Sequence, residues 1–321
     1  MKFLTPIFAL VFLVLLIVNV KYMLSNPFVA GTELSESIRS NHFAFFLPEA
    51  DSVFFEEVKK GADYAAQLMD CSISYHPIDK DPLSLEMARY TGIDGLMVYP
   101  YQKDDTLLAS MEKIYDSGIP IVQIENQAMI KPKSVFVGTN SFDFGKAIGR
   151  LALRTEMENL RIALVYSDRN PGLMAYGSLL EMGMKSILGT RISVLRSYQT
   201  SQNHLDAEKL AYELIQSKDA YTLIVFTDTN DTLVAVQAMI DMNLVGSVQI
   251  IGFGNDPAIN AYINKGVVLG SIVRDAYSIG FNAVAALTEI RKSGNTSVYV
   301  DTGISIIDKE TSPSQPHGGA R

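Results

Sequence analysis

The chain has 321 residues, enough for two domains with cores of their own, and 48% of them are hydrophobic. Its formal net charge of −8 argues against a nucleic-acid-binding protein, because phosphate groups require a basic surface. The single cysteine, Cys71, excludes a disulfide within this sequence, and the four histidines are too scattered for a metal centre.

The first 24 residues are typical of a membrane-directing segment. Lys2 precedes the apolar run PIFALVFLVLLIV at 6–18. An apolar span of about 18–20 residues can cross a bilayer, whereas the apolar region of a cleaved signal usually has about 7–15. We expect a transmembrane anchor over residues 1–24, with a cleaved signal peptide as the alternative. The protein is then anchored at the extracytoplasmic face of the cell membrane, or is periplasmic or secreted if the helix is cleaved.

Beyond a polar linker at 25–40, short apolar runs alternate with amphipathic stretches of helical period. Continuous apolar strands between helices predict parallel sheets covered on both faces. Ten or eleven strands are many for one open sheet, so two similar halves are expected, with a seam in VFVGTNSFDFG at 135–145. The tail at 312–321 has a composition typical of disorder. The predicted strands lie at 42–47, 71–76, 94–98, 119–124, 134–137, 161–166, 191–197, 221–226, 248–253 and 267–273.

Motifs of catalysis are missing from this sequence. It has no Gly-x-Ser-x-Gly elbow and no phosphate loop, and the acidic FTDTND segment at 226–231 does not match the spacing of a calcium loop. We therefore expect that the protein is not an enzyme and that it binds no cofactor and no metal ion. An enzyme acting on a sugar stays as an alternative, for which Glu125 and Asp228 are the only acid and base pair that could be nominated.

The residues that follow the predicted strands are carboxylates, amides and aromatics. In open parallel α/β sheets, ligands bind beyond the carboxyl ends of the strands. Carboxylates accept hydrogen bonds from adjacent hydroxyls and rings cover the C–H faces of a sugar, so this set favours a small neutral polyol. Many of the same residues could equally be helix caps or core packing. The set comprises Glu49, Asp51, Phe54, Phe55, Tyr99, Tyr101, Glu125, Asn126, Asp168, Asn170, Tyr176, Asp228, Asn230, Asn255 and Asp256.

Eight stretches in this order resemble the type 1 periplasmic binding proteins, specifically their ribose/xylose/galactose-binding branch, over nearly all of residues 41–307. Each stretch is weak alone, and their order makes the resemblance specific. They are ADSVFFEEVKKGA (50–62), GIDGLMVYP (92–100), SGIPIVQIENQ (117–127), VFVGTNSFDFGKAIG (135–149), MAYGSLLEMGM (174–184), FTDTNDTLVAVQAM (226–239), VQIIGFGNDPAINAYI (248–263) and GSIVRDAYSIG (270–280).

The resemblance implies an α/β fold of two doubly wound parallel-sheet lobes that close on a ligand. We expect the N-terminal lobe at 41–138 plus 275–299 and the C-terminal lobe at 139–274 plus 300–311. The three crossings are expected near Thr139, near Arg274 and around Val300, with Thr139, Asn140 and Arg274 acting as the hinge.

The resemblance also implies the ligand contacts, with departures from the family pattern. Glu125-Asn126 stands where the family often has Asp-Arg, no arginine stands at Ser178 or Leu180, and Arg274 occupies a position often held by glutamine. Arg274 could supply the donor that is lost at the other positions, or it could form a hinge ion pair with a neighbouring carboxylate. Helix spacing places Phe54 on the core stripe with Val58, so that Phe55 is expected to be the better ligand contact. The predicted ligand-binding residues are Asp51, Phe54, Phe55, Tyr99, Glu125, Asn126, Tyr176, Ser178, Asp228, Thr229, Asn230, Asn255 and Arg274.

We thus predict a binding protein for a small neutral sugar, and expect a monosaccharide. The closed form would be presented to a membrane partner, either a sensor histidine kinase or an ABC permease, and anchored relatives of similar N-terminus favour sensing. A transcription regulator would need a DNA-binding headpiece in place of the apolar N-terminus. A partner-binding module that needs no ligand remains an alternative.

Overall fold

The computed structural model describes most of the chain beyond residue 40. The chain divides into the units Met1–Ser40 and Asn41–Arg321. Of the expected N-terminal helix only Leu13, Leu15, Leu16 and Lys21 are described, all helical, so the expected anchor, the linker and the tail beyond Ser312 lie outside the described residues. Within the described part of the chain, no helix combines the length and apolar character needed to span a bilayer. The described ranges are 40–49, 53–78, 82–100, 105–127, 134–201, 203–217 and 221–312.

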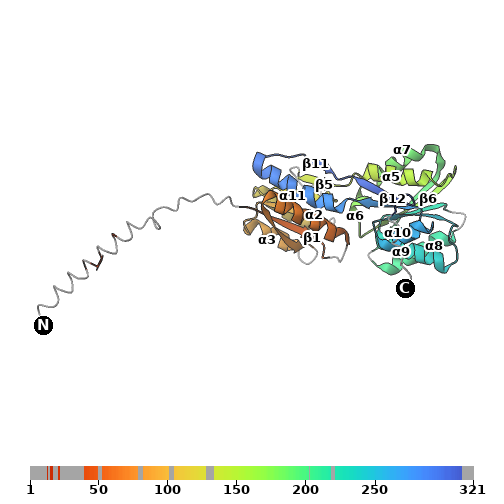
Figure 1. Ribbon diagram of the computed structural model, residues 1–321, viewed down its shortest axis with the longest axis horizontal. Helices are drawn as coiled ribbons and strands as arrows, with labels where there is room; N and C mark the ends of the chain where they lie inside the picture. The colour runs from red at the N-terminus through yellow and green to blue at the C-terminus, as the bar shows by residue number, and fades with distance from the viewer. Residues whose placement is uncertain are drawn as a thin grey trace, which may run out of the picture. The chain divides into compact units, whose positions relative to one another are not determined.

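The first lobe is a six-stranded sheet with helices on both faces (Figure 1). Its strand order is β11-β5-β4-β3-β1-β2, and every neighbouring pair is parallel. The strands are β1 (Asn41–Leu47), β2 (Cys71–Pro77), β3 (Gly95–Val98), β4 (Ile121–Ile124), β5 (Val135–Gly138) and β11 (Tyr299–Asp301). The helices are α2 (Val53–Met69), α3 (Pro82–Met87), α4 (Asp105–Asp116) and α11 (Ala276–Ser293), with a short 3-10 turn η1 (Ala88–Tyr90).

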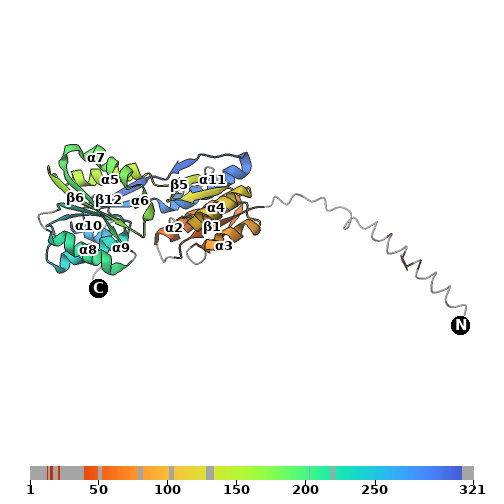
Figure 2. The same cartoon turned by 180° about the vertical axis from the view of Figure 1, so that it is seen from behind.

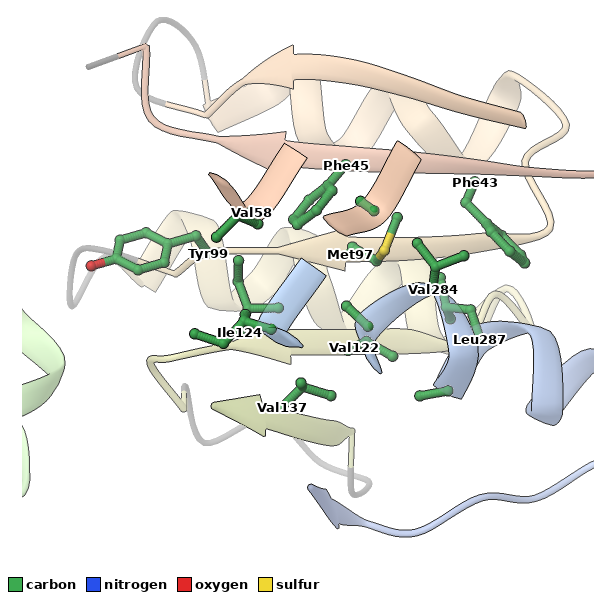
Figure 3. Packing of buried hydrophobic residues seen from close by; sticks show 14 of the residues in the cluster. Phe43, Phe45, Val58, Met97, Tyr99, Val122, Ile124, Val137, Val284 and Leu287 are labelled. Carbon is green, nitrogen blue, oxygen red and sulfur yellow. The ribbon is translucent and has the colours of Figure 1, made fainter. Parts of the chain in front are cut away.

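Strand β1 shows why the apolar runs are continuous. Phe43 and Phe45 pack against α2 and α11, where they join Val58 and Leu287 in one cluster (Figure 3). The intervening Ala44 and Phe46 belong to the cluster on the opposite face, with residues of α3 and α4. Figure 2 shows these two helices beside β1. Because successive side chains point to opposite faces, a strand buried on both faces must be apolar at nearly every position.

The second lobe repeats this architecture with a different edge. Its strand order is β12-β10-β9-β8-β6-β7, and its pairs are parallel except the antiparallel pair β10 and β12. Helices α5 and α7 cover one face, and α8, α9 and α10 cover the other. The strands are β6 (Leu160–Ser167), β7 (Ile192–Thr200), β8 (Leu223–Phe226), β9 (Gln249–Phe253), β10 (Gly270–Arg274) and β12 (Ile304–Asp308). The helices are α5 (Ser141–Leu153), α6 (Pro171–Ala175), α7 (Gly177–Leu188), α8 (His204–Gln216), α9 (Thr229–Asp241) and α10 (Pro257–Asn264), with the 3-10 turn η2 (Gly189–Arg191).

The chain passes between the lobes at three places. It leaves β5 for α5 through Thr139 and Asn140, and the Asn140 side chain caps α5 by accepting hydrogen bonds from two backbone amides. It returns after Arg274, the last residue of β10, into α11. The third passage follows Val300, which still pairs with Val137 in the first sheet, and runs from β11 to β12.

Paired glycines bring helices together on one face of each lobe. A side chain at Gly61 in α2 would stand 2.0 Å from the backbone oxygen of Tyr277 in α11, and one at Gly280 would stand 1.8 Å from that of Val58. In the second lobe, a side chain at Gly145 of α5 would meet the backbone of α7, and a side chain at Gly183 of α7 would meet the backbone of α5. Each helix pair therefore crosses at backbone contact, a spacing that a Cβ atom would prevent.

Candidate functional site

Three strand ends meet at Arg274. Its guanidinium donates from Nη1 to Oε2 of Glu125, at 2.7 Å, and from Nη2 to Oδ1 of Asn170, at 2.9 Å. Glu125 follows β4 in the first lobe and Asn170 follows β6 in the second, so Arg274 contacts both lobes. The side chains of Arg274 and Glu125 are only 5% and 4% exposed. A buried charge pair of this kind gains from short, charge-assisted hydrogen bonds, which offset the loss of hydration.

Two aromatic rings cover the same guanidinium. The Arg274 carbon Cζ lies 4.2 Å from the ring centre of Phe54 and 4.9 Å from that of Phe253. Phe54 belongs to the first turn of α2 and Phe253 to the end of β9, so each lobe supplies one ring. Both distances are within the range of cation–π attraction, which strengthens when the cation is desolvated. The Arg274 Nε is buried and has no hydrogen-bond partner among the described residues.

Glu125 is held in an unusual backbone conformation. Its φ is +59°, in the left-handed region that side chains rarely adopt. Its second carboxylate oxygen, Oε1, accepts from both the amide and the hydroxyl of Thr139, each at 2.9 Å. Gly138 allows this approach, because a Cβ there would be 2.9 Å from the Glu125 backbone. Backbone strain at a buried, fully bonded carboxylate points to a functional position.

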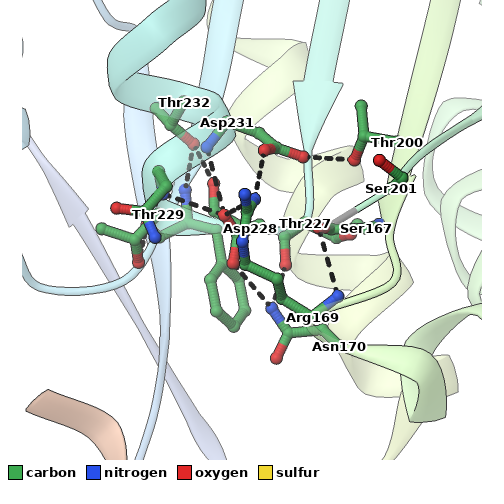
Figure 4. Close-up of polar contacts among 12 residues, drawn as sticks. Ser167, Arg169, Asn170, Thr200, Ser201, Thr227, Asp228, Thr229, Asp231 and Thr232 are labelled. Atoms are coloured by element: carbon green, nitrogen blue, oxygen red, sulfur yellow. Dashed lines mark hydrogen bonds and ion pairs between the residues drawn. The ribbon is translucent and has the colours of Figure 1, made fainter. Parts of the chain in front are cut away.

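A second buried ion cluster lies wholly within the second lobe (Figure 4). Arg169 Nη1 is 2.7 Å from an oxygen of Asp231 and 3.3 Å from one of Asp228. Burial raises the pKa of Asp231, and Thr200 and Arg169 oppose that shift. Asp228 caps α9 through the amides of Asn230 and Asp231, and it also accepts from the Asn170 amide at 3.3 Å. Asn170 thus links this cluster to Arg274.

A crevice of about 740 Å³ opens beside Phe54, Phe253 and Arg274. The first lobe contributes residues of α2 and α11, and the second contributes the ends of β9 and β10. Its walls include the carboxylates of Glu57, Asp256 and Asp275. Since Arg274 is already paired with Glu125, the lining is acidic and aromatic overall. Such a lining suits neutral ligands with many hydroxyl groups better than anions.

Four of the thirteen predicted ligand-binding residues line the crevice, and others are buried close to Arg274. Phe54, Thr229, Asn255 and Arg274 line the crevice. Glu125 and Asp228 are buried partners of the two arginines. Asn126 is buried where the lobes touch. Its Oδ1 packs against Gly172 of α6, and a Cβ atom built at Gly172 would lie 1.7 Å from that oxygen.

Our expectation for the two phenylalanines was wrong about which one is in the core. Phe55, at 8% exposure, belongs to the core cluster with Val58, and its ring meets Tyr99 edge-on at 5.1 Å. Phe54 is only partly buried and faces Arg274. Tyr99 is itself 2% exposed, and this burial raises its pKa. The aromatic available to a ligand is therefore Phe54.

Other predicted residues lie apart from Arg274 or outside the description. Ser178 is exposed and lines a separate hollow of about 340 Å³ with Tyr166 and Glu181. Asn230 is exposed on α9. The Tyr176 hydroxyl donates to the backbone oxygen of Gln127 at 3.4 Å, which is a contact between the lobes. Asp51 lies outside the described residues.

Sequence reasoning missed Arg169, Asp231 and Phe253. Arg169 stands between Asp168 and Asn170, both of which we noted as strand-end residues, so its position was a usable signal. Phe253 is the last residue of an apolar strand and stands two residues before Asn255, where the resemblance implies a Phe-Asp-Gly motif, so its position was also a usable signal. Among the described residues, no group of three or more histidines, cysteines and acidic residues could hold a metal ion.

The chain is similar to known proteins over most of its length. Residues 43–295 match the family model described as "Periplasmic binding protein domain". None of the curated proteins matches the chain. Similar solved structures include GanP, a glucose-galactose binding protein from Geobacillus stearothermophilus, at 21% identity and a TM-score of 0.74, covering 86% of this chain and 99% of that one.

Two further structures are similar over the same region. A periplasmic solute binding protein of an ABC transporter from Actinobacillus succinogenes, with bound D-allose, has 17% identity and a TM-score of 0.73, covering 85% of this chain and 99% of that one. The XylFII–LytSN complex includes a chain with 18% identity and a TM-score of 0.71, covering 85% of this chain and 99% of that one. At these identities the likeness shows the fold.

Proposed function

The chain belongs to the periplasmic binding protein family, and from that premise we propose that it captures a small neutral sugar between its two lobes and presents the closed form to a membrane partner. The binding step is a closure in which the ligand stabilises the closed state because it contacts both lobes. No covalent chemistry is involved, so the protein is a receptor and not an enzyme.

One observation supports this proposal most strongly. Phe54 and Phe253 face the same space from different lobes, and Glu125, Asn170 and Arg274 provide hydrogen-bonding groups beside them. Rings cover the C–H faces of a sugar while carboxylate and amide groups bind its hydroxyls, which is the usual equipment of a saccharide site.

The structural neighbours support a monosaccharide as the ligand. GanP is named as a glucose-galactose binding protein, and the Actinobacillus protein holds D-allose. These ligands are neutral hexoses, in agreement with the acidic crevice of this chain.

We further propose a sensor histidine kinase or an ABC permease as the membrane partner. One neighbour is found in a complex, XylFII–LytSN, and another belongs to an ABC transporter. Either role places the protein at the extracytoplasmic face of the membrane, tethered by the apolar residues 6–18 if they are retained. A tether raises the effective concentration near a partner.

A thermal-shift screen tests the sugar proposal. The full chain, in mild detergent, is heated with pentoses, hexoses and cyclic polyols. A ligand at about a hundred times its Kd stabilises the folded state by about 2.7 kcal/mol, which raises the melting temperature measurably. We expect one sugar to give this shift and Phe54→Ala to abolish it.

The control is Ser178→Ala, which changes an exposed residue of the separate hollow and should keep the full shift. A panel in which every sugar is silent, with a folded protein, would overturn the proposal.

A second candidate function, an interaction module that needs no ligand, is favoured by the completed Arg274 network. The groups expected to bind a sugar already bind one another. In that case the partner's extracytoplasmic domain would bind this chain with the same affinity in the presence and absence of every sugar.

A further inference from the structure

Three interactions join the two lobes around Arg274. Arg274 of the second lobe is ion-paired with Glu125 of the first. Asn126 lies directly against the backbone of Gly172, and Tyr176 donates to the Gln127 backbone. These contacts join the segment after β4 to the segment after β6 and to the end of β10. The described conformation is thus one in which the lobes meet around Arg274.

The guanidinium of Arg274 occupies the groups that a sugar would use. Each terminal nitrogen has a short hydrogen bond, one to Glu125 and one to Asn170, and Phe54 and Phe253 cover the planar group. A ligand that stacks on these rings and binds Glu125 therefore has to displace at least part of the guanidinium.

We propose that Arg274 is a specificity-determining residue that competes with the ligand and ties the lobes together until a ligand replaces its contacts. This inference rests on the proposed sugar-binding function and specifies the chemistry of the sugar. Glu125 requires a hydrogen-bond donor and Arg274 an acceptor, and both must be supplied at once because the two groups are buried.

A pair of adjacent hydroxyl groups meets this requirement. One hydroxyl donates to Glu125 while its neighbour accepts from Arg274, and the two charges stay close enough to compensate each other. A carboxylate ligand would satisfy Arg274 but repel Glu125, and an amine would do the reverse. Arg274 therefore selects a neutral sugar with a vicinal diol, and a deoxy analogue that lacks one of these hydroxyls leaves a buried group unpaired.

The lobe-tying role can be measured as a distance in the ligand-free protein. Spin labels are placed at Leu68→Cys in α2 and Leu205→Cys in α8, which are 65% and 67% exposed, in a Cys71→Ser background of the full chain. We expect a narrow distribution by double electron–electron resonance. Arg274→Gln should lengthen or broaden it, because glutamine cannot make the charged bond to Glu125.

Two further variants make this measurement decisive. Gly172→Ala should also widen the distribution, since its methyl group would meet Asn126 Oδ1 at 1.7 Å without any change of charge. The matched control is Arg154→Gln, which breaks the ion pair with Asp308 inside the second lobe, away from Arg274, and should leave the distance unchanged. A distribution for folded Arg274→Gln that coincides with that of the parent would overturn the lobe-tying role.

The specificity role is tested by titration calorimetry with the best sugar and its monodeoxy analogues. We expect the parent protein to prefer the complete sugar over the critical deoxy analogue, and Arg274→Gln to reduce that preference by about tenfold, equivalent to about 1.4 kcal/mol. An unchanged ratio would overturn the specificity role, and Arg154→Gln provides the control for a general loss of stability. If no sugar binds, the proposed function fails while the distance measurement still decides whether Arg274 ties the lobes.

Discussion

Phe54 and Phe55 are neighbours on the first turn of α2, but their side chains have different surroundings. Phe55 packs against Tyr99 in the core, whereas Phe54 contacts Arg274 at the crevice. We expect Phe55→Ala to lower the free energy of unfolding by about 3–5 kcal/mol, as for a buried aromatic, and Phe54→Ala to lower it by much less. Urea unfolding followed by circular dichroism measures both, and equal losses would contradict the assignment.

The phase of this helix could not be decided from sequence. A period of 3.6 residues accommodates Phe54, Val58, Ala62 and Ala65 as well as the same stripe begun at Phe55. The structure selects the second pattern because Tyr99 and the residues of α11 pack there. Those partners come from segments far away in the sequence, so the local periodicity of α2 cannot indicate them.

The carboxyl group of Asp308 predicts how the stability of the protein depends on pH. Burial by itself would raise its pKa, but hydrogen bonds from Thr311 and the Glu310 amide, with Arg154 alongside, bring the pKa below the usual value. A carboxyl whose pKa is lowered by folding contributes stability that is complete above the unfolded pKa of about 3.9 and is lost as the pH falls through the folded pKa.

We therefore expect Asp308→Asn to lower the melting temperature at pH 7, and the gap to the parent protein to shrink as the pH falls below about 4. Melting curves at several pH values measure the gap. Glu310→Gln, in the same turn with a side chain 82% exposed, is the control and should show almost no gap. A gap for Asp308→Asn that stays constant down to acid pH would contradict the prediction.

At the level of whole elements, most of the sheet was predictable. The apolar runs coincide with strands that are buried on both faces, such as β1, β3 and β8, and the two parallel-sheet lobes are confirmed. The strands β11 and β12 were not among the predicted runs. Both are short, lie at sheet edges and are partly exposed, so they have no continuous apolar pattern to mark them.

The helix pair α2 and α11 provides a test of backbone packing. In an isolated helix, replacing glycine by alanine is favourable by roughly 1 kcal/mol. At Gly61 the new methyl group would meet the Tyr277 backbone oxygen at 2.0 Å, so the helices must separate. We expect Gly61→Ala to be destabilising by about 2 kcal/mol or more in urea unfolding, because overpacking typically costs about 1–3 kcal/mol on top of the lost approach.

Gly118→Ala serves as the control for this substitution. Nothing lies within 4 Å of its Cβ position, but its φ is +85°, so only backbone strain of about 1 kcal/mol is expected. If Gly61→Ala proved as stable as the parent protein, the helices would not be held at backbone contact.

On the scale of the whole molecule, the negative net charge predicts that anionic sugars bind more weakly than neutral ones. The chain carries −8 at neutral pH, and carboxylates line the crevice. We expect the uronic acid of the best sugar to raise the melting temperature less than the neutral sugar does. The difference should narrow as salt is added, because exposed charges are screened beyond about 10 Å at 0.1 M ionic strength.

A thermal-shift series in rising sodium chloride measures this effect, with the neutral sugar as its own control. A uronic acid that stabilises the protein as strongly as the neutral sugar at low salt would contradict the charge argument.

The centre of the site was the part least accessible to sequence reasoning. Arg274 is separated from Glu125 by 149 positions and from Asn170 by 104. The sequence could place each residue at a strand end, and it identified Glu125 and Arg274 as candidates. It could not show that the two bind each other, because that contact depends on how the lobes meet.

The late position of α11 in the chain has a consequence for how the protein is made. Strands β1 to β5 are complete by Gly138, but one face of their sheet is covered by α11, which ends at Ser293. A ribosome therefore has to translate the whole second lobe up to Arg274 before Phe43, Phe45 and Met97 can be enclosed. Closing so long a loop makes the folding of the first lobe slow, and the nascent chain exposes an aggregation-prone surface during that interval. When α11 is synthesised the second sheet lacks only its edge strand β12, so we expect most of that sheet to form before the first lobe is complete.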